Sequence, residues 1–143
     1  MLQIFRISHW AYVVGIPFLP RFLYVLNRII FSVVLPPSLE VGKDVLFGYS
    51  GLGIVIHARC KIGSRVQIGT NVTIGGRNGH KEVPIIEDDV LVGTGAKILG
   101  PIVIGRGSRI GANAVVLTNV EPGATVVGIP ARPIKSIVNS TPI

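Results

Sequence analysis

The sequence is poor in cysteine, in acidic residues and in charge of either sign. Its 143 residues include one cysteine, and seven Asp and Glu stand against fourteen Lys and Arg. A single cysteine excludes an intrachain disulfide and cannot by itself form a zinc cluster, which fits a reducing compartment. The net charge of +7 is spread thinly from Arg6 to Lys135, and no basic stripe with interleaved aromatics indicates nucleic-acid binding. The basic balance favours a small anionic cosubstrate that carries phosphate.

Apolar runs long enough to cross a bilayer are also lacking. The apolar stretch 10–19 is too short, and the next one is interrupted by Arg21, Asn27 and Arg28. No small-residue cleavage site follows a hydrophobic core near the start, so we expect no secretory signal. The sequence therefore predicts a cytoplasmic protein.

Aliphatic residues, in contrast, recur with a six-residue period. Ten of them share one phase, and glycine follows most of them: Ile56, Ile62, Ile68, Ile74, Ile86, Val92, Ile98, Ile104, Ile110 and Val116. A second phase, two residues earlier, holds mostly small or aliphatic side chains: Cys60, Val66, Val72, Val90, Ala96, Ile102, Ser108, Ala114 and Val120. In such a phase a thiol acts as a small apolar filler. A repeat this short cannot bury its own apolar side, so the copies must stack, and the period predicts an all-β solenoid, a parallel β-helix.

The period divides the chain into three parts. Residues 1–34 lack it and show helical spacing broken by Pro17 and Pro20, which predicts a short helical extension of two helices. Residues 35–133 form the predicted solenoid, and 134–143 are a C-terminal tail, which we expect to fold back along the last coils. Within the solenoid the phase slips by three residues at 51–53, and the polar, glycine-rich stretch 75–84 is typical of a loop.

Two roles fit the helical extension. Its helices either pack as a cap on the solenoid or on a neighbouring copy, or they lie on an anionic membrane surface. Arg6, Arg21 and Arg28 flank apolar stretches in the manner of interfacial helices. In the second case the protein sits at the inner face of the cytoplasmic membrane.

Five short runs carry a resemblance to a known family: Gly53-Ile54-Val55-Ile56, Val72-Thr73-Ile74-Gly75-Gly76, Gly93-Thr94-Gly95-Ala96-Lys97-Ile98-Leu99-Gly100, Gly111-Ala112-Asn113-Ala114-Val115-Val116-Leu117 and Gly128-Ile129-Pro130-Ala131-Arg132. In their order and almost in their spacing they resemble the hexapeptide-repeat acyltransferases, and within these the serine acetyltransferase-like branch. The resemblance implies a left-handed coil, a homotrimer, and acetyl-CoA bound in the crevice between two neighbouring prisms.

The chain departs from that branch at one informative position. Serine acetyltransferases carry a His-Ala-Thr-Gly stretch whose histidine serves as the base, and here the same positions hold Ser50, Gly51, Leu52 and Gly53. They also carry a large helical N-terminal domain, whereas the extension here is about 34 residues. Short members of the branch resemble acetyltransferases of capsule and exopolysaccharide assembly. We therefore expect a sugar hydroxyl as the acceptor.

Acetyl transfer to an alcohol needs a base, and histidine is the usual one near neutral pH. His80 follows Asn78-Gly79 in the predicted loop, a placement that resembles the antibiotic-modifying hexapeptide acetyltransferases. His57 follows an inward isoleucine, so its ring must point outward at a coil corner. With Tyr49 and Ser50 it could line the acceptor end of the crevice. Each histidine has a plainer alternative as an exposed polar residue.

Acetyl-CoA needs donors for its carbonyls and cations for its phosphates. Gly93 and Gly95 would let a cosubstrate approach the backbone, and Ala96, Lys97 and Ala112 match CoA-side positions of the resembled family. The candidate phosphate partners are Arg109, Arg132 and Lys135, each with ordinary solubilising charge as its alternative.

Acidic residues near the loop allow two further interpretations. Glu82, Glu87, Asp88 or Asp89 could orient the catalytic histidine, and the sequence does not choose among them. The run 87–89 follows an inward isoleucine, which favours a solvated corner over a cation site. A zinc site would need three converging histidines, and His9 lies outside the repeat. We predict no metal.

The expected function is an acetyl-CoA-dependent O-acetyltransferase that modifies a sugar of a surface polysaccharide or its precursor. Serine O-acetyltransferase in cysteine biosynthesis is the alternative. A non-catalytic solenoid that binds or scaffolds a partner is a second alternative.

Overall fold

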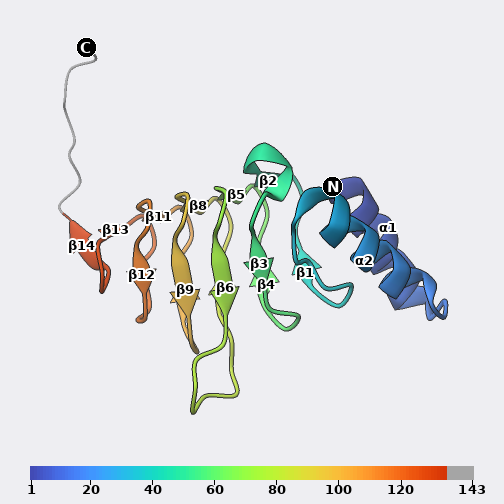
Figure 1. Cartoon of the computed structure of the whole chain (residues 1–143). Coiled ribbons are helices and arrows are strands. Elements are labelled where there is room, and N and C mark those ends of the chain that lie inside the picture. The colour runs from blue at the N-terminus through green and yellow to red at the C-terminus, as the bar shows by residue number, and fades with distance from the viewer. Residues whose placement is uncertain (135–143) are drawn as a thin grey trace.

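The structure is a computed structural model that describes residues 1–134, and it consists of two helices followed by a three-sided solenoid (Figure 1). Helix α1 (Leu2–Val14) ends at Gly15, whose φ of 82° is the left-handed conformation that glycine adopts readily. Helix α2 (Leu19–Phe31) has Pro20 in its first turn, where a missing N–H costs nothing. Neither helix is both long and apolar enough to cross a membrane. The two helices are called the helical hairpin below.

The strands of the solenoid form three sheets, one on each face of the prism. Face 1 consists of β1 (Glu40–Val41), β4 (Lys61–Ile62), β7 (Ile85–Ile86) and β10 (Val103–Ile104). Face 2 consists of β2 (Leu46–Phe47), β5 (Gln67–Ile68), β8 (Leu91–Val92), β11 (Arg109–Ile110), β13 (Thr125–Val127) and β14 (Arg132–Ile134). Face 3 consists of β3 (Val55–Ile56), β6 (Thr73–Gly75), β9 (Lys97–Leu99) and β12 (Val115–Val116). The chain turns from one face to the next at the 1–2, 2–3 and 3–1 corners.

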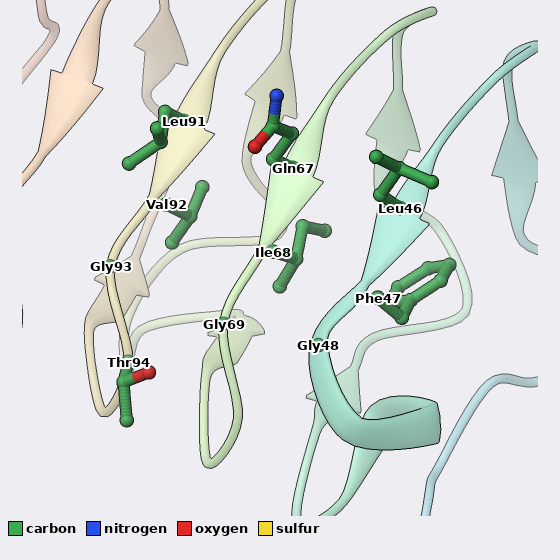
Figure 2. Close-up of a pocket in the computed structure, with 10 residues that line it drawn as sticks. All are labelled: Leu46, Phe47, Gly48, Gln67, Ile68, Gly69, Leu91, Val92, Gly93 and Thr94. Atoms are coloured by element: carbon green, nitrogen blue, oxygen red, sulfur yellow. The ribbon is translucent and has the colours of Figure 1, made fainter.

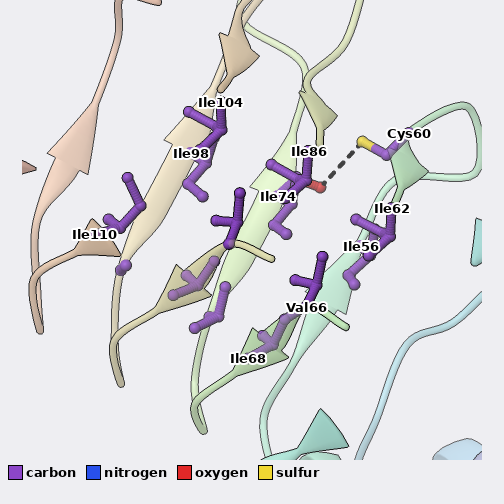
Figure 3. Packing of buried hydrophobic residues seen from close by; sticks show 14 of the residues in the cluster. Ile56, Cys60, Ile62, Val66, Ile68, Ile74, Ile86, Ile98, Ile104 and Ile110 are labelled. Atoms are coloured by element: carbon purple, nitrogen blue, oxygen red, sulfur yellow. Dashed lines mark hydrogen bonds between the residues drawn. The ribbon is translucent and has the colours of Figure 1, made fainter. Parts of the chain in front are cut away.

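The six-residue period explains this architecture. One face takes six residues and a coil takes three faces, so a residue pairs with the one 18 positions on, as Ile86 does with Ile104. The two inward phases then stack above one another and fill the prism (Figure 3). Burial of each such isoleucine contributes roughly 1.5–3 kcal/mol. The prediction of a left-handed parallel β-helix with a short helical extension is confirmed.

Both interruptions of the period fall where the sequence predicts them. Val41 pairs with Ile62, 21 residues on, so the slip of three residues lies within one coil. Ile62 pairs with Ile86, 24 residues on, so six extra residues are expelled between β6 and β7. They belong to the segment 76–84, here called the histidine loop, which projects from the prism (Figure 1). The inward residues before and after this loop, such as Ile62 and Ile86, therefore still stack on each other.

Cys60 lies in the second inward phase, as predicted. Its side chain is buried, and Sγ donates a hydrogen bond to the carbonyl oxygen of Ile74 at 3.7 Å (Figure 3). Burial raises the pKa of this thiol to about 11, because the charged thiolate loses its hydration. Cys60 is thus a filler of the core.

The last described residues run back along face 2. Strand β14 pairs antiparallel with β13, so that Arg132 lies opposite Val127. The prediction for the tail 134–143 stays a prediction, because residues 135–143, including the candidate Lys135, lie outside the described residues.

Candidate functional site

The 2–3 corner is built from glycine and asparagine. Asn71, Gly95 and Asn113 all have positive φ, between 56° and 77°, which lets the chain turn sharply at this corner in successive coils. Gly93 is required for another reason: a Cβ there would lie 2.6 Å from the backbone nitrogen of Ala112 in the next coil. Stacking of coils therefore explains Gly93 without a ligand.

A shallow groove of about 350 Å³ runs along face 2 and ends at this corner (Figure 2). Leu46, Gln67 and Leu91 stand in a row on three neighbouring strands, and the cross-strand pairs continue to Arg109. The groove is mostly apolar, with the amide of Gln67 and the hydroxyl of Thr94 among its polar groups. Its chemistry suits a long ligand with apolar and amide segments.

Two backbone amides of the 2–3 corner matter here: Thr94 lines the end of the groove, and Ala112 follows the next strand, β11. In the described part of the chain, the N–H groups of Thr94 and Ala112 make no hydrogen bond to the backbone. Those of Gly93 and Gly95 are used up, by the carbonyls of Ile110 and Thr70. Donors for a ligand carbonyl are therefore offered at positions 94 and 112, one residue away from the glycines.

The other predicted cosubstrate residues are placed unevenly. Arg109 stands on the groove face, and Arg132 lies on the same sheet near the C-terminal end. Ala96 is fully buried, so its side chain belongs to the core. Lys97 lies on face 3, where its Nζ donates to the carbonyl oxygen of Asn71 at 2.7 Å.

Tyr49 and Ser50 lie in a short 3₁₀ segment, η1 (Gly48–Gly51), at the 2–3 corner. Their φ values are 47° and 56°, and Tyr49 is 89% exposed. Two consecutive non-glycine residues in the left-handed region cost backbone energy that their exposed side chains do not repay. The phase slip at 51–53 follows directly. Single residues at other corners, such as Arg65 and Asp89, have φ values of 56° and 61°, so this conformation belongs to the turn at a corner.

The two candidate histidines both belong to the 3–1 corner. His57 follows β3, and the histidine loop, with Asn78 and His80, leaves the same corner one coil later. Arg59 connects them, because its Nη2 donates to the carbonyl oxygen of Lys81 at 2.5 Å. This contact holds the loop beside the coil of His57.

His57 is further defined by a local hydrogen bond. Its Nδ1 accepts the backbone N–H of Arg59 at 3.2 Å, so a neutral ring carries its proton on Nε2. In that tautomer the outward nitrogen is a donor. His57 is thus better suited to orient a ligand than to take a proton, and His80 remains the candidate base.

Within one chain the candidates form two groups at different corners. Tyr49, Ser50, Ala112 and the groove belong to face 2 and the 2–3 corner, whereas the histidines and Asn78 belong to the 3–1 corner. Face 3 separates the two corners. The two groups thus do not share a corner of one prism.

The acidic run 87–89 lies at the remaining corner, far from either group. Arg65 binds Asp89 through two hydrogen bonds of 2.6 and 2.8 Å, and Arg106 approaches Asp88 at 3.2 Å. The hydrogen bonds from Arg65 lower the pKa of Asp89. Within residues 1–134 no three His, Cys, Asp or Glu side chains converge as metal ligands would.

Sequence reasoning missed Gln67, Thr94 and Arg59. Gln67 is recognisable in hindsight, because it is the outward residue between inward Val66 and Ile68. The open amide of Thr94 and the contact of Arg59 with the loop depend on which coils lie side by side. No pattern in the sequence predicts these two features.

Comparison with known proteins agrees with this geometry. Residues 84–118 match the bacterial transferase hexapeptide family (six repeats). The serine acetyltransferase of Bacillus subtilis is 40% identical over 129 residues, 89% of this chain and 59% of that protein. The serine acetyltransferase of Escherichia coli K12 is 39% identical over 133 residues, 92% of this chain and 48% of that protein.

Solved structures give the same result. A serine acetyltransferase in complex with CoA superposes with a TM-score of 0.86 and 34% identity, over 93% of this chain and 55% of that one. The soybean enzyme complexed with serine gives 0.87 and 38%, again over 93% and 55%. The chain thus spans about half the length of these relatives.

These relatives correct one prediction. The sequence analysis favoured a sugar hydroxyl as the acceptor because Ser50 replaces the family's histidine. The similar proteins are serine acetyltransferases, which contradicts the polysaccharide interpretation and supports the serine alternative. The hexapeptide period, the three-sided prism and these similarities together establish that the chain belongs to the hexapeptide-repeat acyltransferases, in the serine acetyltransferase-like branch.

Proposed function

We propose that this protein transfers the acetyl group of acetyl-CoA to the hydroxyl of L-serine. The observation that carries the proposal is 40% identity to a serine acetyltransferase over 89% of the chain. Two of the similar serine acetyltransferase structures are complexes, one with CoA and one with serine. The groove and the open amides offer a place for the first ligand.

The acetyl donor binds along the groove of face 2. Its apolar and amide segments follow the row of Leu46, Gln67 and Leu91, and its phosphates meet Arg109. The N–H groups of Thr94 and Ala112 donate to the thioester carbonyl and stabilise the oxyanion that develops there. Removal of one such donor typically lowers kcat by 10²–10³-fold, roughly.

His80 supplies the base in this proposal. A serine hydroxyl such as that of Ser50 does not take up a proton near neutral pH, so the position of the family's histidine cannot serve here. His80 removes the hydroxyl proton, and the oxygen attacks the thioester carbon. The carbon–sulfur bond then breaks, and the leaving sulfur of CoA takes the proton back from His80.

We also propose a homotrimer, in which the site is shared between chains. The 3–1 corner of one chain brings His80 to the 2–3 corner and groove of its neighbour. Support comes from the separation of the two groups on one prism, each of which offers half of the required chemistry. Tyr49 and Ser50 would then border the serine.

A cytoplasmic location follows as part of the same proposal, because the acetyl donor is a cytoplasmic metabolite. Contact of residues 1–34 with a membrane is a separate proposal, since no residue of the candidate site belongs to the helical hairpin.

Thiol release from acetyl-CoA tests the activity directly. We expect release that depends on L-serine, and a fall in kcat of about 10²-fold or more in His80→Ala. His57→Ala, the matched histidine of the same corner, should affect KM more than kcat. No serine-dependent release by a folded protein would overturn the proposal.

Mixed assemblies test the shared site. Thr94→Trp fills the end of the groove, and His80→Ala removes the base, so each variant alone should be inactive. Refolded together in equal amounts, they should regain activity, because some shared sites then contain neither change. Absence of any recovery, with mixed assemblies confirmed by mass, would place both groups in one chain.

A further inference from the structure

The helical hairpin turns its largest apolar side chains outward. On α1 the exposed stripe consists of Ile7, Trp10 and Val14, and on α2 it runs through Phe18, Phe22 and Ile29. The spacing of three, four or seven residues puts each set on one side of its helix. Phe18, at the tip of the hairpin, is 88% exposed. An exposed apolar surface of this extent marks an interaction site.

The orientation of the hairpin is fixed by polar contacts on its other side. Arg6 donates to the carbonyl oxygens of Val41 and Gly42, and His9 Nδ1 donates to that of Pro37 at 2.8 Å. Ser8 Oγ donates to the carbonyl oxygen of Pro20 at 2.9 Å and ties α1 to α2. The outward face is therefore held in place by the solenoid and cannot simply turn over.

The charge of this segment has one sign. The first 39 residues contain three arginines and no acidic residue, since Glu40 is the first carboxylate of the chain. With Arg6 engaged by the solenoid, Arg21 and Arg28 remain exposed on α2. They stand one above the other, about 90° around the helix from the stripe of Phe18, Phe22 and Ile29.

The tip of the hairpin is strained as well as apolar. Phe18 has a φ of 65°, a region that costs energy for a residue with a large side chain. Its ring gains no compensating burial in the described structure. A cover for the ring from outside residues 1–134 would offset this strain.

We propose that the hairpin lies on an anionic lipid bilayer, with its apolar stripes in the acyl boundary and Arg21 and Arg28 at the headgroups. Thirteen-residue helices are about 20 Å long, shorter than the roughly 30 Å hydrocarbon layer, so they lie in the plane of the interface. A second copy is the poorer occupant. Face-to-face contact would bring the same arginines together with no carboxylate of residues 1–39 to neutralise them.

Trp10, the single tryptophan of the chain, reports on this contact without a label. Purified full-length protein is titrated with vesicles of phosphatidylcholine alone and of phosphatidylcholine with phosphatidylglycerol. We expect a blue shift and co-sedimentation with the anionic vesicles, weakened by salt. Binding to neither vesicle would overturn the proposal.

Two sets of variants separate the apolar and the charged contributions. Phe18→Gly removes the ring and relieves the positive φ, so it should retain or raise the melting temperature while binding falls about tenfold or more. Arg21→Gln with Arg28→Gln should lower anionic binding by roughly fivefold per arginine. Ile129→Ser removes a 75% exposed side chain at the other end of the solenoid. This control variant should change neither vesicle binding nor the melting temperature.

Sedimentation velocity without lipid tests whether a second copy of the chain, in place of a bilayer, covers the apolar face. If the wild-type protein forms an assembly whose mass Phe18→Gly lowers, the apolar face covers another copy of the chain and the lipid proposal is wrong. If the mass is the same in both proteins and vesicle binding depends on Phe18, the lipid proposal is supported.

Discussion

The prism and the helical hairpin distribute apolar side chains in opposite ways. In the prism every coil sends two phases of aliphatic residues inward and leaves small, polar or charged residues at the corners. In the hairpin, many aromatic and branched side chains lie on the outside, and the buried residues Phe5 and Ala11 are accompanied by the polar Ser8 and Asn27. In the prism the inward apolar side chains are covered by neighbouring coils. In the hairpin only the side that contacts the solenoid is covered.

The difference shows what a repeat contributes. Each coil of the prism presents its neighbour with an identical surface, so any apolar residue in phase finds a partner directly above it. The hairpin occurs once and has no neighbour of its own kind. Its outer face therefore depends on an external surface.

Truncation of matched isoleucines should give the largest difference between the regions. Ile98→Ala removes a fully buried side chain and should lower the free energy of unfolding by about 3–4 kcal/mol. Ile29→Ala, at a position 74% exposed, should lower it by less than about 0.5 kcal/mol. Urea unfolding at one protein concentration measures both. Equal losses would mean that the hairpin face is covered in solution.

The interior thiol should give a smaller, pH-dependent effect. Because burial raises the pKa of Cys60 from 9.0 to about 11, its contribution to stability is complete below pH 9 and is lost as the pH rises through 11. The loss amounts to roughly 2–3 kcal/mol for the full shift. The difference in unfolding free energy between wild type and Cys60→Ala, followed from pH 8 to pH 11, should narrow accordingly. Parallel curves would show that the interior at this coil is open to water.

Surface charge should give the smallest effect. Arg65 lowers the pKa of Asp89, so this pair stabilises the fold above the ordinary carboxyl pKa and loses its effect as the pH falls through the lowered value. Asp89→Asn, a change that tolerates the φ of 61°, should slightly lower the urea midpoint at pH 7.

The hairpin offers the control for this pair. Within residues 1–134 no carboxylate forms an ion pair with Arg21, so Arg21→Gln should leave the midpoint unchanged. High salt, about 0.5 M NaCl, should abolish the difference between Asp89→Asn and the wild type. A difference that survives high salt would point to packing in place of charge.

The fold could be predicted from the sequence because each six-residue repeat corresponds to one face of the prism. A six-residue repeat fixes which side chains are inward, and therefore where Ile62, Ile86 and Ile104 stack. It also exposes the slip at 51–53 and the loop at 75–84 as breaks in phase. Helical spacing predicted the hairpin by the same kind of reasoning.

The site was less accessible, because it depends on which corner each residue occupies. His57 and His80 are 23 positions apart and share a corner, whereas Tyr49 is closer in sequence to His57 and lies at another. Sequence reasoning placed Tyr49 beside His57 for that reason. The acceptor was misjudged because one replacement, at Ser50, was given more weight than the similarity of the whole chain.

The uniform offset between paired strands has a consequence for how the protein forms. The backbone hydrogen bonds between neighbouring coils join residues 13 to 25 positions apart, so each added coil closes a loop of similar, modest length. The entropy lost per coil is then nearly constant, and no late step has to bring distant segments together. Folding can nucleate at whichever coil orders first and propagate from there to the neighbouring coils on both sides.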